Sequence, residues 1–129
     1  MRKIALLLAV VALAACNDST SPNGNASGSY SLRTINGSNL PYTFSDNSVL
    51  TSDQLTLNSN GTYIDVATFS NAGSSTEQGL WSINNNLITF EDQTDGITYT
   101  GSVSGSVLTE TFNSNGSVSG SVTEVYQKN

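Results

Sequence analysis

The sequence contains no histidine and only one cysteine, Cys16, in 129 residues. Histidine is the commonest general base and the commonest transition-metal ligand, so its absence removes most acid–base and metal-centred chemistry. A lone cysteine excludes a disulfide framework. The two Gly-Ser-Val-Ser-Gly stretches carry valine where a nucleophilic serine elbow needs serine. We therefore expect a protein that is not an enzyme and that needs no cofactor.

Positive charge is also scarce, with four Lys and Arg against ten Asp and Glu and a formal net charge of −6. Two of these cations, Arg2 and Lys3, lie at the extreme N-terminus. A surface of this kind repels phosphate backbones and anionic lipid headgroups. The balance argues against a nucleic-acid partner and against membrane attachment through a basic patch.

The first sixteen residues have a composition unlike the rest of the chain. Arg2 and Lys3 precede an almost wholly apolar run from Ile4 to Leu13, and Leu13-Ala14-Ala15-Cys16 follows. Ten apolar residues are too few to span a hydrocarbon core of about 30 Å. A basic start, a short apolar run and small residues at its end are typical of a secretory signal peptide.

The segment that ends at Cys16 resembles the lipobox of bacterial lipoproteins. The resemblance implies a diacylglyceryl group on the Cys16 thiol, cleavage of residues 1–15 and further acylation, for example by palmitate, on the new amino group. Two or more acyl chains hold a protein on a membrane where one is marginal. We therefore expect a lipid-anchored protein of the cell envelope, periplasmic or on the outer surface. An ordinary signal peptide with a chance cysteine, or an N-terminal apolar anchor, explains the same pattern.

Cleavage before Cys16 leaves 114 residues, and loss of Arg2 and Lys3 takes the formal charge from −6 to −8. Residues 16–27 are small and polar and predict a flexible tether. Residues 28–127 are expected to form one domain. No long segment there has a helical apolar period, and short runs alternate between apolar and polar residues. We expect strands at residues 29–35, 50–57, 62–69, 77–83, 87–91, 97–103, 107–112 and 118–127.

The connections between these runs carry tight-turn residues. Asn60-Gly61 and Asp95-Gly96 are favoured hairpin dipeptides, and asparagine tolerates the positive φ that Asn84-Asn85-Asn86 requires. Residues 40–49 predict a longer loop with a short strand piece, residues 71–75 and 113–116 predict loops, and Gly120 predicts a bulge. Short hairpins predict an all-β, up-and-down antiparallel meander of about eight strands, and closure into a barrel would remove its exposed edges. An immunoglobulin-like sandwich is the alternative, although it needs longer crossovers.

Three short motifs are similar to those of lipocalin-like domains. Gly28 followed by Tyr30 matches the glycine and aromatic of their first strand, although tyrosine replaces the usual tryptophan. Asn36, Gly37, Leu40 and Pro41 match an Asn-Gly-x-x-Leu-Pro stretch, and Gly79 with Trp81 matches a later Gly-x-aromatic. The C-terminal helix of full lipocalins has no counterpart. The resemblance implies a small β-barrel that can hold a ligand.

An eight-stranded barrel has room for packed side chains or for one small ligand. If a pocket exists, we expect Tyr63, Trp81 and Tyr99 to line it and a small apolar molecule to occupy it. The alternative is a solid-cored structural or interaction module that meets an envelope protein through its surface.

Acidic residues supply two further candidate sites. Glu91, Asp92 and Asp95 surround one turn and form a weak calcium candidate, although a solvated turn looks the same. Asp65 and Glu110 lie among apolar neighbours and would form an acid pair suited to glycoside hydrolysis if both pointed inward. We expect both to face outward instead.

Overall fold

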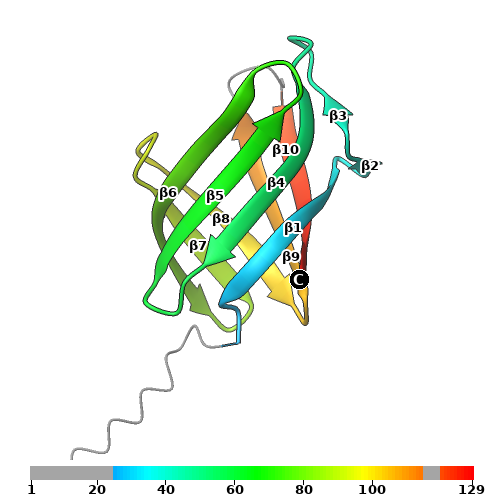
Figure 1. The fold of residues 1–129 in the computed structure, drawn as a ribbon. Coiled ribbons are helices and arrows are strands. Elements are labelled where there is room, and N and C mark those ends of the chain that lie inside the picture. The colour runs from blue at the N-terminus through cyan, green and yellow to red at the C-terminus, as the bar shows by residue number, and fades with distance from the viewer. Residues whose placement is uncertain (1–24, 115–119) are drawn as a thin grey trace, which may run out of the picture.

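The computed structural model describes residues 25–114 and 120–129, so the predicted signal peptide and most of the tether lie outside the described residues. Within the described residues, no helix is long and apolar enough to cross a membrane. The described chain forms strands joined by turns and short loops (Figure 1). In chain order the strands are β1 (Gly28–Ile35), β2 (Ser38–Asn39), β3 (Tyr42–Thr43), β4 (Val49–Leu57), β5 (Thr62–Phe69), β6 (Gly73–Asn84), β7 (Leu87–Asp92), β8 (Ile97–Ser104), β9 (Val107–Ser114) and β10 (Gly120–Lys128).

Eight of these strands close into an antiparallel barrel. Each strand from β4 to β10 pairs with the next along the chain, and β1 pairs with β10 on one side and with β4 on the other. The short β2 and β3 extend the sheet beyond this ring, beside β1 and β4 (Figure 1). The closed meander confirms the predicted all-β barrel, and it is not the immunoglobulin-like sandwich.

The predicted turn residues adopt the backbone conformations that tight turns need. Asn85 has φ 54°, and Asn36 and Gly37 have φ 49° and 79°. Gly61 and Gly96 also have positive φ, at 86° and 71°. Asparagine and glycine accept this left-handed region at little steric cost, so the hairpins form where the sequence predicts them.

Two local expectations were wrong, and a third was wrong in part. Residues 71–75 were expected to be loop, but β6 begins at Gly73. Its ladder with β5 starts there, where Gly73 lies opposite Phe69. Gly120 was expected to form a bulge, but the β9–β10 register runs without a shift from Gly120 to Gln127. The register shifts instead between Leu32 and Thr34 in β1 and between Leu50 and Ser52 in β4. The predicted loop at 113–116 lies partly outside the described residues, while Asn113 belongs to β9.

Alternation along the strands directs one side of the sheet to the barrel interior. The largest fully buried side chains are aromatic and aliphatic, and every one belongs to an inward-facing position of a ring strand: Tyr30, Ile35, Leu55, Leu57, Tyr63, Ile88, Phe90, Leu108, Val122 and Tyr126. Removing such side chains from water is the main favourable term in folding, at about 25 cal/mol per Å² of apolar area. The core is therefore the lumen of the barrel.

Two interior glycines allow neighbouring strands to approach closely. A Cβ at Gly79 on β6 would collide with the backbone oxygen of Glu91 on β7 and lie 2.9 Å from Tyr63 Cε1. A Cβ at Gly101 on β8 would lie 2.5 Å from the backbone oxygen of Thr109 on β9. Both glycines therefore serve packing between strands.

The chain enters the barrel at the end opposite β3 (Figure 1). Ala26, which the sequence assigns to the tether, is buried, and the Tyr30 hydroxyl donates to its carbonyl oxygen at 2.6 Å. The Lys128 ammonium donates to the carbonyl oxygen of Asn25 at 3.0 Å and lies 5.8 Å from the centre of the Tyr30 ring. These contacts fix the residues just before β1 against the barrel.

Candidate ligand-binding site

The barrel interior is filled at one level and hollow at another. Tyr63 packs edge to face on Phe90 at a ring distance of 5.2 Å, and Phe90 stacks on Tyr99 at 4.9 Å. Beyond Tyr99 a cavity of about 210 Å³ opens, bordered by Phe44, which follows β3. This volume is smaller than the roughly 300–1,000 Å³ of pockets for drug-sized molecules, so it suits a small ligand.

Carboxyl groups line this cavity in unusual number. Five of the ten Asp and Glu residues of the chain contribute to its wall, namely Asp53, Asp65, Glu77, Glu110 and Glu124. The rest of the lining is mostly apolar and comprises Phe44, Leu50, Ala67, Phe69, Ile97, Tyr99 and Phe112, together with Ser75. The cavity therefore combines an acidic interior with aromatic and aliphatic walls.

The strand register places four of these carboxyls in opposed pairs. Asp65 on β5 lies opposite Glu77 on β6, and Glu110 on β9 lies opposite Glu124 on β10. Like charges directly opposite each other destabilise a sheet. Two such pairs inside one barrel mean that the folded protein holds these groups against their mutual repulsion.

Asp53 and Asp65 form a third pair, one step diagonal in the β4–β5 ladder, where Asp53 lies opposite Ala67. Burial raises the pKa of both carboxyls. A hydrogen bond between them opposes this rise at Asp53, whereas the hydrogen bond and the negative charge of Asp53 raise the pKa of Asp65 further. Their mutual interaction therefore disfavours ionisation of both carboxyls at once.

The other interior groups also favour their neutral forms. Burial is the main cause throughout, and it raises the pKa of Glu77 and of Glu124 to about 7. Burial and then the charge of Glu124 raise the pKa of Glu110 well above its usual value. The same two causes raise the pKa of Tyr126, whose hydroxyl donates to Glu124 Oε2 at 3.2 Å. At neutral pH the cavity thus holds protons that exposed carboxyls would have released.

Several of these buried oxygens lack a hydrogen-bond partner, and no basic group reaches them. Asp53 Oδ1, Asp65 Oδ1 and Glu110 Oε1 are buried without a partner. Of the two cations in the described residues, Arg33 is exposed and Lys128 contacts Asn25 and Tyr30, and neither lines the cavity. Unpaired buried acceptors and uncompensated buried charge both cost free energy.

A gap between β8 and β9 lies beside this cavity. Their ladder runs from Ser104–Val107 only to Thr100–Thr111, although both strands continue. A groove of about 710 Å³ follows the unpaired segments and shares Glu77, Ile97, Tyr99 and Phe112 with the cavity. The rings of Tyr99 and Phe112 stand 6.1 Å apart there. The groove therefore adjoins the cavity and shares one of its carboxyls, Glu77.

The three aromatics expected to line a pocket are not brought together at this one. Tyr99 lines the cavity. Tyr63 and Trp81 are buried in the filled level instead and are not among its lining residues, and the Trp81 indole donates to the carbonyl oxygen of Asn58 at 2.9 Å. Tyr63 still supports the cavity wall indirectly, because its ring packs on Phe90 and Phe90 stacks on the lining residue Tyr99.

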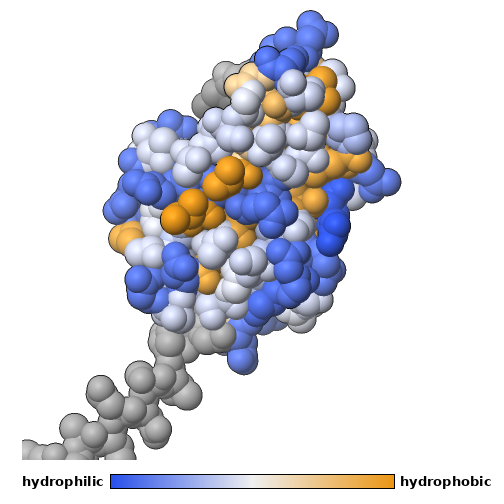
Figure 2. All heavy atoms as spheres, in the orientation of Figure 1, coloured by the Kyte–Doolittle hydropathy of each residue, from blue (hydrophilic) through white to orange (hydrophobic). Residues whose placement is uncertain are grey.

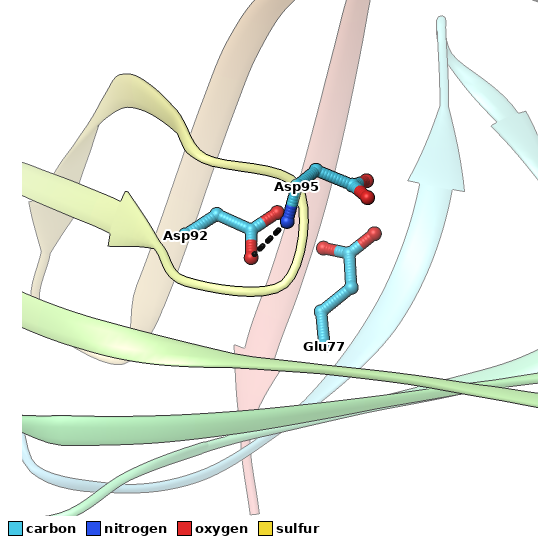
Figure 3. A group of neighbouring side chains, drawn as sticks. All are labelled: Glu77, Asp92 and Asp95. Atoms are coloured by element: carbon cyan, nitrogen blue, oxygen red, sulfur yellow. Dashed lines mark hydrogen bonds between the residues drawn. The ribbon is translucent and has the colours of Figure 1, made fainter.

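The group of carboxylates that could hold calcium differs from the predicted one by one residue. Glu91 is exposed, whereas Glu77 joins Asp92 and Asp95, with one oxygen of each within 4.8 Å of the others (Figure 3). Asp92 Oδ1 accepts hydrogen bonds from the backbone N–H of Thr94 at 2.7 Å and of Asp95 at 3.3 Å, so this carboxyl shapes the turn. Oxygen ligands of this kind suit a hard cation such as calcium, which takes six to eight of them.

The expectation that Asp65 and Glu110 face outward was wrong. Both line the cavity, and Glu110 is 3 % exposed. Asp53, Glu77 and Glu124 were not among the candidate site residues predicted from the sequence. Each stands in phase with inward-facing residues, as Asp53 does with Leu55 and Leu57. Strict alternation would have identified all five carboxyls.

The described chain is thus a closed, eight-stranded, lipocalin-like β-barrel with an acidic cavity. In structure it is similar to a lipocalin-like protein from Bacteroides uniformis ATCC 8492, with a TM-score of 0.52 and 15 % sequence identity, over 82 % of this chain and 100 % of that one. At this identity the likeness shows the fold alone. No protein-family model and no curated protein matches the sequence.

Proposed function

We propose that this protein is a non-enzymatic, lipid-anchored envelope protein that binds a small molecule inside its barrel. The observation that carries the binding function is the cavity of about 210 Å³, which adjoins the groove between β8 and β9. A cavity in a protein interior lowers stability, so a barrel selected for stability alone would be expected to fill this space with side chains.

The segment that ends at Cys16 supports the anchor. The chain enters the barrel at the end away from β3, whereas the cavity is bordered by Phe44, just after β3 (Figure 1). A lipid on Cys16 would therefore be joined to the barrel at the end away from the cavity, which leaves the cavity end free of the attachment.

A solid-cored module that acts through its surface is the alternative. The unfilled interior argues against it. On the face shown in Figure 2, hydrophobic atoms form small separate patches among polar ones. Among the large exposed apolar side chains of the described residues, Ile64 on β5 and Leu80 on β6 are diagonal neighbours, whereas Leu87 on β7 and Ile97 on β8 stand at opposite ends of their ladder. A docking surface usually presents a broader continuous patch.

Intact-mass and native mass spectrometry of protein gently extracted from its own membrane test both parts. We expect acyl chains on Cys16, which Cys16→Ser removes, and a co-purifying small molecule. Ala67→Trp fills the cavity and should lose that molecule, while Val66→Trp, on the opposite face of β5, should keep it. An unmodified thiol contradicts the anchor, and equal retention by both tryptophan variants contradicts binding in the barrel.

A further inference from the structure

We propose that the ligand is a small organic cation, with its ammonium group among the interior carboxyls and an apolar body against the walls near Phe44. This inference rests on the proposed function and names the ligand class of that same cavity. It replaces the expectation of a purely apolar ligand. Four observations on the cavity wall carry it.

The first observation is the set of unpaired acceptors. Glu110 and Asp53 are 3 % and 6 % exposed, both line the cavity, and each has a carboxyl oxygen with no hydrogen-bond partner. Buried polar atoms in folded proteins are almost always paired. An ammonium group carries three N–H donors and no acceptor, so it supplies what these oxygens lack.

The second observation is the charge. Five carboxyls share the cavity, and neither of the basic residues in the described chain lines it. An anionic ligand would be repelled by every carboxyl of the wall that ionises. A neutral apolar ligand would desolvate the carboxyls without compensating them. A cation gains from every carboxylate that it meets, most strongly where water is excluded.

The third observation is the remainder of the wall. The rings of Phe44 and Phe69 lie 6.3 Å apart, and those of Tyr99 and Phe112 lie 6.1 Å apart, all four lining the cavity. Aromatic faces attract cations and accept apolar groups. A hydrated inorganic ion would gain no apolar contact from such a wall. An amine with an apolar body would place its ammonium group at the carboxyls and its apolar part against the aromatic rings.

The fourth observation separates an organic cation from a metal ion. Among the described residues, the one group of three carboxylates close enough to share an ion is Glu77, Asp92 and Asp95. Of these three side chains, which Figure 3 shows together, only Glu77 belongs to the cavity lining. The other cavity carboxyls stand in pairs, Asp53 with Asp65 and Glu110 with Glu124, so they offer an ion fewer close ligands than calcium takes and suit a polyatomic cation.

The protonation of the cavity wall is consistent with this inference. Burial raises the pKa of Glu110 and of Glu124, so both carboxyls favour their protonated forms in the ligand-free protein. Asp53, Asp65, Glu77 and Tyr99 also line this space. Asp92, Asp95, Tyr63 and Tyr126 do not line it, but they interact with its lining groups: the two aspartates with Glu77, Tyr63 with Tyr99 and Tyr126 with Glu124. A bound ammonium would displace protons from these carboxyls, so binding should release protons and strengthen as pH rises from about 5 to about 8.

Isothermal titration calorimetry of the delipidated full-length mature protein, freed of co-purified ligand, provides the test. The probes are phenethylammonium chloride, 2-phenylethanol and sodium phenylacetate, which share a ring and differ in charge. We expect the cation to bind at least about tenfold more tightly than the alcohol, and the anion to bind more weakly than either. The measured heat of phenethylammonium binding should differ between phosphate and Tris buffers, because binding of the cation releases protons that the buffer takes up.

Matched variants locate the effect. Glu110→Gln and Glu124→Gln keep the side-chain shape and should weaken phenethylammonium binding at least about tenfold while leaving the alcohol unaffected or bound more tightly. Glu91→Gln, on the exposed face of β7, should change nothing. Calcium chloride at matched ionic strength should give no binding that depends on Glu110.

The outcomes separate this inference from the proposed function. If the cation binds no better than the alcohol, or if calcium binding requires Glu110, the cationic ligand is wrong. Binding of the alcohol that Ala67→Trp abolishes would still support a ligand-binding barrel in that case. Equal weakening of cation binding by Glu91→Gln would show attraction by net charge alone and would also overturn the inference.

Discussion

Glu110 on β9 and Glu124 on β10 lie directly opposite each other in one antiparallel ladder, and both line the barrel cavity. The Tyr126 hydroxyl donates to Glu124 at 3.2 Å, whereas Glu110 Oε1 has no partner. Two ionised carboxylates at this position would repel each other in a poorly solvated space. The folded barrel therefore binds protons that the unfolded chain does not.

This difference sets how stability depends on pH. In unfolded chains Asp and Glu titrate near pH 3.9 and 4.3, while the folded pKa of Glu77 and of Glu124 is about 7. The folded state binds more protons between these values, so the free energy of unfolding should fall as pH rises from about 5 to about 8. Urea unfolding of the ligand-free protein measures this. A free energy of unfolding that rises over this range contradicts the account.

Substitution of one glutamate should remove part of that dependence. Glu124→Gln abolishes a charge and keeps an oxygen for the Tyr126 hydroxyl. We expect a gain of about 1–3 kcal/mol in the free energy of unfolding near pH 8 and little gain near pH 5. Glu91→Gln, which changes an exposed carboxyl, should shift stability by less than about 0.5 kcal/mol at either pH. Equal destabilisation by Glu124→Gln at both pH values would contradict an interior charge.

The apolar–polar periodicity of the sequence predicted most of the strands and the hairpins that join them. Alternation placed Tyr63, Ala67 and Phe69 on one face of β5, and turn dipeptides such as Asp95-Gly96 placed the hairpins. Local chemistry decides these features, because pleating fixes the side of each residue and positive φ selects glycine or asparagine. The closing contact between β1 and β4 joins neighbours in the folded ring and followed from the number of strands.

The binding site was harder to predict because polarity and phase disagree there. Asp65 lies between Tyr63 and Ala67 in the inward phase, yet a carboxyl is normally placed in solvent. The polarity of Asp65 and Glu110 predicted that both side chains face solvent. The alternation of the strand directs them into the barrel instead. Asp53 and Glu77 carried the same signal, in phase with Leu55 and Trp81 respectively. How deep the apolar filling extends depends on packing across the barrel, which no single strand encodes.

Gly79 should tolerate no side chain. The β6 backbone passes so close to β7 that a Cβ there would collide with the Glu91 carbonyl oxygen. Gly79→Ala must push these strands apart and should lower the free energy of unfolding by about 2 kcal/mol or more. Ser82→Ala, on the outer face of β6, serves as the control and should be nearly neutral. Chemical denaturation of both variants measures the difference, and a neutral Gly79→Ala would mean that the strands are farther apart.

The interior acids should not perform hydrolysis. Asp65 and Glu110 share the cavity, as a glycosidase acid and base share a cleft, but burial raises the pKa of both carboxyls and so disfavours the ionised form that a general base needs. We expect no turnover of 4-nitrophenyl glycosides above the uncatalysed rate. Release of nitrophenol that Glu110→Gln abolishes, with Glu91→Gln unaffected, would contradict a purely binding role.

The direct test of an acidic cavity is the titration of the Glu110 carboxyl itself. Carbon-13 NMR of side-chain carboxyls, with the Glu110 resonance assigned by its loss in Glu110→Gln, reports its protonation in the ligand-free protein. Because this carboxyl is buried opposite Glu124, we predict that it stays protonated at pH 7. Titration near pH 4.3, as for a glutamate in an unfolded chain, would place Glu110 in solvent and contradict the account.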